Sequence, residues 1–371
     1  MVSARAGLAA STARSVRLRR GDRAAQNAVA LTPGAAADVH LELEGKLALY
    51  MGTEEAMIFS YDVATPASTI PAFAKRGDLL VVDEGVNYAL QAGVTLSRSE
   101  VRYFKHNDLD DLRRVLEEVA AEDAAARRTT PLNRRFIVVE GLYANYGDLA
   151  PLADICALKR QFCYRLLVDE SMSFGALPGG AGRGAAEHAG VPAGEVEIIT
   201  ASLGNTLGSV GGFCAGSKQV ISHQRLNASG YCFSASLPPY LAAGAVAALR
   251  ALGAAPQLRD TLARNAAALR AGVAKLPGVA PPAGEPFCPL LHLRLAAPPA
   301  GIEAQEALLQ RVCDRALTDG GVLFVTAKYS VVERRRPSPS IRIAVSAAHG
   351  VEDIDAALKA LKAALAKEGV C

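Results

Sequence analysis

The chain has 371 residues, 50% of them apolar, and a formal net charge of +3. This length allows a large hydrophobic core and two lobes, and the nearly balanced charge argues against a general affinity for nucleic acid. Its seven cysteines have no paired C-x-x-C spacing, so we expect neither a zinc site nor a disulfide framework. No apolar run reaches the roughly 18–20 residues that cross a bilayer. We therefore expect a globular protein that does not insert into a membrane on its own.

The N-terminal segment differs in composition from the rest of the chain. Residues 1–30 are rich in Arg, Ala and Ser, and Asp22 is their only acidic residue. Such a segment suits an organellar transit peptide, a disordered tail or a wrongly assigned first exon. We expect residues 1–37 to be disordered or wrongly assigned, and folded sequence to begin at residue 38.

From residue 38 to about residue 245, apolar runs alternate with segments of helical periodicity. Near-continuous apolar strands that alternate with helices indicate a mainly parallel sheet covered on both faces, which is an α/β fold. Strands are predicted at 56–60, 78–83, 101–104, 135–140, 164–168 and 197–201, and helices at 38–50, 65–73, 107–126 and 151–160.

After Leu237-Pro238-Pro239 the composition changes to alanine-rich helices and a proline-rich turn. This change predicts a separate, smaller α+β domain over residues 246–371, behind a large domain over 38–245. Its expected elements are helices at 240–252, 257–276, 303–319 and 351–367, and strands at 290–295, 321–327 and 341–345.

Polar side chains stand where several predicted strands end: Asp83, Glu140, Asp169 and, after the next strand, Asn205. In open parallel sheets, ligands bind at the carboxyl ends of the strands. The sequence therefore predicts a binding site at this edge.

Several segments resemble the α-oxoamine synthase family, pyridoxal-phosphate enzymes that condense an amino acid with an acyl-CoA. The longer runs are similar to the long-chain-base subunits 1 of serine palmitoyltransferases, and the resemblance covers residues 38–371. It implies an aminotransferase-like large domain and a small C-terminal α+β domain. The family segments are 53–56, 140–143, 147–152, 168–170, 182–184, 211–213 and 346–349, and the longer runs are 104–108, 134–143, 223–226 and 230–239.

The resemblance also assigns positions in a cofactor site. Asp169 falls where the family pairs an aspartate with the pyridine nitrogen, and Asn87 and Met172 replace two expected histidines, the first of which stacks on the ring. Asn205 replaces the Schiff-base lysine. An amide is neither basic nor nucleophilic, so we expect no catalytic residue in this chain and no catalysis by the chain alone.

Two further positions bear on this interpretation. Asp62 falls in the expected phosphate-binding turn and would repel a phosphate. Lys218 is a possible substitute nucleophile, although a solvated surface lysine is the simpler interpretation.

Other candidates have both structural and functional interpretations. Arg342 falls where the family carries paired arginines near the substrate carboxylate, but Ser340 replaces one of the pair, and burial of Arg342 against the last helix is an equal alternative. The run 333–337 is interpreted as a solvated loop, with contact to CoA phosphate or acidic lipid as the alternative. His106 is expected to be structural, and the glycines of 179–184 to form a loop near a subunit interface.

Together the resemblance implies a lysine-less subunit of serine C-palmitoyltransferase, which condenses L-serine with palmitoyl-CoA to 3-oxosphinganine in sphingolipid biosynthesis. A lysine-bearing partner would form the heterodimer and hold most of the pyridoxal phosphate. We expect the cytosolic face of the endoplasmic reticulum membrane, reached through the partner or a missing N-terminus. The alternatives are a self-sufficient pyridoxal-phosphate acyltransferase that uses another lysine, and a structural, regulatory or defective homologue.

Overall fold

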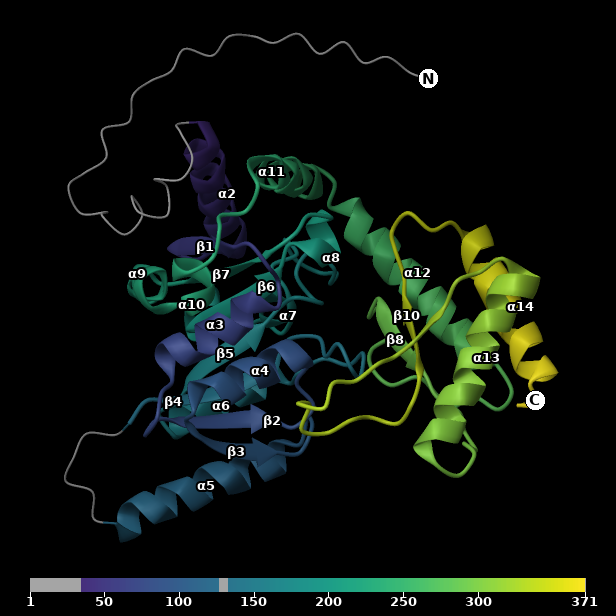
Figure 1. The fold of residues 1–371 in the computed structure, drawn as a ribbon, viewed down its shortest axis with the longest axis horizontal. Coiled ribbons are helices and arrows are strands. Elements are labelled where there is room, and N and C mark those ends of the chain that lie inside the picture. The colour runs from purple at the N-terminus through teal and green to yellow at the C-terminus, as the bar shows by residue number, and fades with distance from the viewer. Residues whose placement is uncertain (1–34, 127–132, 371) are drawn as a thin grey trace.

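The computed structural model describes residues 35–126 and 133–370, with side chains from residue 38 onward. The predictions for residues 1–34 and for the loop at 127–132 lie outside the described residues. Two sheets, each with its own helices, make up the described chain (Figure 1).

The large sheet has seven strands in the order β1-β7-β6-β5-β4-β2-β3. All neighbouring pairs are parallel except those of β7, which is antiparallel to both β1 and β6. The predicted α/β fold with a mainly parallel sheet is therefore confirmed. The strands are β1 (Glu55–Phe59), β2 (Leu79–Asp83), β3 (Glu100–Phe104), β4 (Arg135–Glu140), β5 (Arg165–Asp169), β6 (Ile198–Ser202) and β7 (Gly212–Gly216).

Helices cover the faces of this sheet, and the sequence did not predict α4, α9 or the three one-turn helices α7, α8 and α10. Helix α4 begins directly after Asn87, whose side chain caps it, whereas the sequence suggested only a cofactor position for Asn87. The helices of this part are α2 (Ala35–Met51), α3 (Ala64–Phe73), α4 (Tyr88–Ser97), α5 (Leu109–Ala125), α6 (Leu152–Gln161), α7 (Ala185–His188), α8 (Gly204–Leu207), α9 (Lys218–Asn227), α10 (Ser229–Cys232) and α11 (Pro239–Ala254).

The small sheet is antiparallel, with the strand order β8-β10-β9. The predicted strand at 321–327 is wrong in length, because only Val325 and Thr326 pair with β10. The C-terminal elements are α12 (Gln257–Val273), β8 (Leu290–Leu293), α13 (Ile302–Gly320), β9 (Val325–Thr326), β10 (Ile341–Ala344) and α14 (Val351–Lys367).

The two larger hydrophobic clusters correspond to the two sheets. One contains buried side chains of β1–β7 and of the helices through α11, and the other contains those of α12–α14 and most of the small sheet. A third, small cluster of Leu142, Cys288 and Leu290 lies between them. We call residues 35–254 the large unit and residues 257–370 the C-terminal unit. Among the described helices none is long and apolar enough to cross a membrane; α11 and α12 pass that test only as a pair, bent by 82°.

Candidate functional site

Three carboxylates end adjacent strands at the carboxyl edge of the large sheet. Asp83, Glu140 and Asp169 end β2, β4 and β5, each with an exposed fraction of 3% or less, and Glu140 lies opposite Asp169 in the strand register. The predicted gathering of these side chains at one edge is confirmed. Burial raises the pKa of Glu140 to about 8, and the nearby charge of Asp169 adds to this shift.

Both carboxylate oxygens of Asp169 accept hydrogen bonds from this chain. Thr200 donates its hydroxyl at 2.7 Å, and Ser171 donates its backbone N–H at 3.1 Å. Burial raises the pKa of Asp169, while these hydrogen bonds act in the opposite direction and the charge of Asp62 raises it further. Neither Thr200 nor Ser171 was predicted as a site residue, although Thr200 pairs with Asp169 in the strand register and Ser171 follows it by two residues. The assignment of Asp169 to a pyridine nitrogen stays a prediction.

Asn205 and Met172, two of the three substituted positions, contact each other. Asn205 lies on the short helix α8, exposed, and its amide nitrogen donates to the carbonyl of Ser171 at 2.8 Å. The same nitrogen lies 3.3 Å from the sulfur of Met172. The amide therefore replaces an amine with a group that bonds back to the turn after β5 and offers no nucleophile.

Asn87, the third substituted position, has a structural function in this chain. Its side-chain oxygen accepts the N–H groups of Ala89 and Leu90 at 2.9 and 3.3 Å, which caps α4. Its own backbone N–H donates to Glu140 at 2.7 Å. An N-terminal cap is a sufficient reason for asparagine here, so the residue is more than a remnant of a stacking position.

The turn before α3, where the resemblance predicts a phosphate-binding turn, presents a carboxylate. Asp62 is exposed, accepts the N–H of Val63 at 2.8 Å, and accepts the N–H of Thr65 on its carbonyl at 3.0 Å. Because a helix N-terminus favours one anion, this carboxylate competes with a phosphate for the same backbone N–H groups.

His106 joins two carboxylates at the same edge. Its Nδ1 lies 3.0 Å from Asp83 and its Nε2 lies 3.1 Å from Asp148, while its ring stacks on Tyr146 with centroids 3.8 Å apart. Burial alone would lower the pKa of His106, but the hydrogen bonds and charges of Asp148 and Asp83 outweigh it and raise the pKa to about 9. The expected structural function of His106 agrees with these contacts.

Lys218 lies at the opposite edge of the sheet from Asn205. It follows β7, which runs antiparallel to β6, so that Gly212 pairs with the end of β6 and Gly216 with its start. Its side chain is exposed, and its backbone N–H donates to Glu54 at 2.8 Å. A length of strand of roughly 15 Å separates it from the Asn205 turn, which excludes it as a substitute nucleophile in this conformation.

The C-terminal candidates differ from expectation. Arg342 is exposed on β10, so the alternative of burial against the last helix is wrong. Ser340 is buried, and its hydroxyl lies 2.9 Å from Nδ1 of His292. The run 333–337 is a loop whose three arginines are exposed, as expected for a solvated loop, but Glu333 departs from this expectation because it is only 7% exposed and accepts a hydrogen bond from Asn145 at 2.8 Å.

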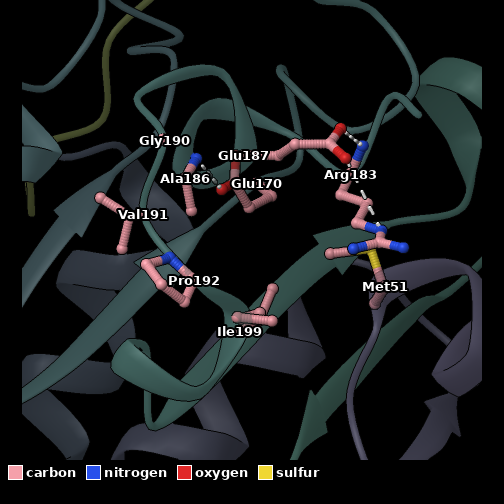
Figure 2. Close-up of a pocket in the computed structure, with 10 residues that line it drawn as sticks. Met51, Glu170, Arg183, Ala186, Glu187, Gly190, Val191, Pro192 and Ile199 are labelled. Atoms are coloured by element: carbon pink, nitrogen blue, oxygen red, sulfur yellow. Dashed lines mark hydrogen bonds and ion pairs between the residues drawn. The ribbon is translucent and has the colours of Figure 1, made fainter. Parts of the chain in front are cut away.

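Glu170, next to Asp169, is bound to the glycine-rich segment that follows. Its carboxylate accepts the N–H groups of Ala185 and Ala186 at 2.8 and 3.0 Å, and the hydroxyl of Ser173. Figure 2 shows Glu170 beside a cavity of about 170 Å³. The glycine-rich loop is held within the chain as well, since Tyr50 donates to the carbonyl of Ala181 at 2.7 Å. Its expected place near a subunit interface stays a prediction.

A second cleft, of about 320 Å³, lies between the two units beside Asn205. Its walls are mostly apolar and come from the turn after β5, from α8, α11 and α12, from the start of β8, and from the end of β10 and the residues that follow it. The lining residues are Met172, Gly175, Ala176, Asn205, Thr206, Leu252, Leu258, Leu262, Pro289, Leu290, Ala344, Val345, Ser346 and Ala347.

These residues do not fit pyridoxal phosphate as a complete site. Asn205 supplies no amine, Asp62 places a carboxylate in the predicted phosphate-binding turn, and Asn87 is used as a helix cap. The edge has three buried carboxylates and, at the position where the resemblance predicts the Schiff-base lysine, an amide.

Comparison with known proteins identifies the family. The sequence profile described as aminotransferase class I and II matches residues 9–361. Serine palmitoyltransferase 1 of Dictyostelium discoideum is 43% identical over 331 residues, which cover 88% of this chain and 68% of that protein. The chain belongs to the aminotransferase class I and II family. Long chain base biosynthesis protein 1c of Oryza sativa subsp. japonica is also 43% identical, over 85% of this chain and 64% of the relative.

The chain thus spans about two thirds of the length of these curated relatives. Among solved structures, serine palmitoyltransferase of Sphingomonas wittichii superposes with a TM-score of 0.78 at 25% identity, covering 94% of this chain and 84% of that one. The 8-amino-7-oxononanoate synthase of Francisella tularensis, at 18% identity and a TM-score of 0.73 over 95% of both chains, shares the fold. The aminotransferase-like fold predicted from the sequence is therefore confirmed.

Proposed function

We propose that this chain is the lysine-less subunit of a serine C-palmitoyltransferase, in which a lysine-bearing partner of the same fold carries the reaction. The complex would condense L-serine with palmitoyl-CoA to 3-oxosphinganine and release CoA and carbon dioxide. Pyridoxal phosphate supplies an electron sink for such chemistry when it is bound. A solved serine palmitoyltransferase of this fold contains that cofactor, at 24% identity and a TM-score of 0.78.

One observation carries the proposal. Asn205 stands on the turn after β6, and its amide nitrogen bonds to the Ser171 carbonyl and contacts the Met172 sulfur. Asn205 therefore contacts Met172, a second substituted position. The lysine position is not the only substituted position of the predicted cofactor site. Asp62 and Asn87 support the same conclusion, because each occupies its position with an interaction of its own.

The chain's own contribution would be structural support of a shared pocket. Each carboxylate oxygen of Asp83, Glu140 and Asp169 accepts at least one hydrogen bond from this chain, so these side chains are held in place without a cofactor. We further propose a heterodimer at the cytosolic face of the endoplasmic reticulum membrane, with attachment through the partner or through sequence outside this chain.

The proposal is tested by expressing the chain alone and together with the lysine-bearing homologue of the same organism. Formation of 3-oxosphinganine from L-serine and palmitoyl-CoA is expected only from the pair. The isolated Asn205→Lys variant is expected to stay inactive, because the anion position and the ring position remain substituted.

Lys218→Ala is the matched control and should leave the activity of the pair unchanged. Activity of the isolated chain that disappears in Lys218→Ala would replace the proposal with a self-sufficient enzyme. Full activity of the isolated Asn205→Lys variant would show that the single substitution at position 205 accounts for the loss of catalytic activity.

A further inference from the structure

The hairpin that joins β9 to β10 has a long loop. Its base closes where the N–H of Ala327 donates to the carbonyl of Ser340 at 2.8 Å, and residues 328–339 leave the small sheet from there. Hairpin loops usually have about two to five residues, and longer ones are often functional. We call residues 328–339 the strap. Figure 1 shows it extending from the C-terminal unit toward the end of β2.

Three consecutive residues of the strap bind three different parts of the large unit. Glu333 accepts a hydrogen bond from Asn145, in the loop after β4, at 2.8 Å. The guanidinium carbon of Arg334 lies 5.2 Å from the ring centroid of Tyr103 on β3, a cation–π distance. Arg335 forms an ion pair with Glu84, directly after β2.

These contacts change the interpretation of the arginine run. Two of its three guanidinium groups are engaged within the chain, Arg334 with the Tyr103 ring and Arg335 with Glu84, whereas Arg336 has no ion pair, hydrogen bond or ring contact among the described residues. Glu333 is held in place locally as well, since it accepts the N–H of Ser330 at 2.5 Å. The run is therefore better suited to fastening the two units than to binding CoA phosphate or acidic lipid.

The strap reaches both sides of the candidate site. Glu84 begins the loop that contains Asn87, whose N–H donates to Glu140. At the other end of the strap, β10 runs from Ile341 to Ala344 and continues into the residues that line the cleft beside Asn205. Movement of the strap therefore connects the β2 side of the site to the C-terminal wall of the cleft.

We propose that the strap is a releasable clasp, which holds the C-terminal unit against the ends of β2 and β3 and lets the cleft beside Asn205 widen when it opens. The Arg335–Glu84 pair is the weak point, because Arg335 is 57% exposed and an exposed pair is screened by salt. Other contacts between the units persist when the strap opens: His292 to the carbonyl of Ala144 at 3.0 Å and Arg294 to that of Asn145 at 3.2 Å. The clasp does not depend on the reaction proposed above.

Amide hydrogen exchange of the full chain tests the clasp. Arg335→Glu is expected to speed exchange in peptides covering 84–97 and 341–347 by about two- to fivefold, the equilibrium factor that one exposed ion pair supplies. Glu84→Arg should act in the same way, and the double variant Glu84→Arg/Arg335→Glu should restore exchange toward the original rates. Arg335→Gln, which removes the charge without reversing it, should give a smaller increase in the same peptides.

Arg336→Glu is the matched control, because it makes the same charge change in the same strap at a residue without a partner. It should leave both regions unchanged. The clasp is overturned if exchange changes only within 328–339, if the double variant fails to restore it, or if Arg336→Glu produces the same increase.

Discussion

Asn87 joins two functions that the sequence could not separate. The resemblance places Asn87 where a histidine would stack on the cofactor ring, which suggests that this histidine has been lost. The structure shows that the Asn87 side chain caps α4, a position that favours asparagine. The cap also fixes the backbone N–H that Glu140 accepts. One side chain thus orders the start of a helix and the strand-end carboxylate beside it.

Replacement of Asn87 by alanine should therefore destabilise the chain. Loss of an N-cap typically costs about 1 kcal/mol of unfolding free energy. Asn87→Ser, which keeps a capping oxygen, should lose only a small part of this, as measured by urea unfolding followed by circular dichroism. Equal stability of the alanine and serine variants would contradict the capping function.

His106 makes stability depend on alkaline pH. Its pKa of about 9 in the folded chain, against an ordinary 6.5, means that the folded state binds the proton more tightly. Stability from this proton is fully present below pH ~6.5 and is lost as the pH rises through about 9, with a total of about 3 kcal/mol.

Glu140, with a pKa of about 8 in the folded chain, also makes the unfolding free energy fall as the pH rises, but this fall is complete by about pH 8. The window from pH 8 to 9 therefore excludes Glu140 but not the buried thiols of Cys214, Cys288 and Cys313, whose raised pKa values also make stability fall there. In unfolding curves taken across this window, His106→Gln should make the fall in stability shallower, and Glu140→Gln should leave its slope unchanged. A fall of equal slope in His106→Gln would assign the whole effect to other groups.

At the scale of elements, the sequence predicted six of the seven strands of the large sheet within one or two residues because their apolar runs are continuous, whereas β7, which begins and ends with glycine, was not among them. It missed α9 and also α4, where Gly93 and Thr95 weaken the helical pattern and the start depends on the Asn87 cap. It also missed the strap, since the contacts of Glu333 and Arg335 join residues distant in sequence. Local periodicity contains no information about such pairs.

Two glycines on the turn between β6 and β7 should respond differently to alanine. Gly211 has φ +91°, and a Cβ there would lie 2.2 Å from the carbonyl oxygen of Phe59, whereas Gly208, with φ +60°, faces open space. Gly208→Ala should cost about 1 kcal/mol, the strain of the left-handed region alone. Gly211→Ala should cost more than about 2 kcal/mol, because the junction of β1 and β7 must move. Similar thermal midpoints for the two variants would contradict the close approach.

Over the whole molecule, Arg270 connects the two cores. It lies on α12, is 5% exposed, and donates to the carbonyls of Cys288 at 3.0 Å, Ala283 at 2.5 Å and Leu290 at 2.5 Å in the C-terminal unit. It also donates to the carbonyl of Gly147 in the large unit at 3.1 Å. Burial lowers its pKa, and no carboxylate bonds to it among the described residues. Backbone carbonyls therefore accept all of its hydrogen bonds among the described residues, while the charges of Asp148 and Glu285 favour its protonated form from a distance.

Arg270→Ala should consequently leave several buried carbonyls without a donor and cost about 3–5 kcal/mol. Because one of these carbonyls belongs to the loop that also contacts His292 and Arg294, the two units should lose their coupling and unfold in separate calorimetric transitions. Arg264→Ala, on the exposed face of the same helix with one bond to Thr261, is the control and should keep the original transition. A single transition with a small shift in Arg270→Ala would show that the strap and the loop after β4 hold the units together without this side chain.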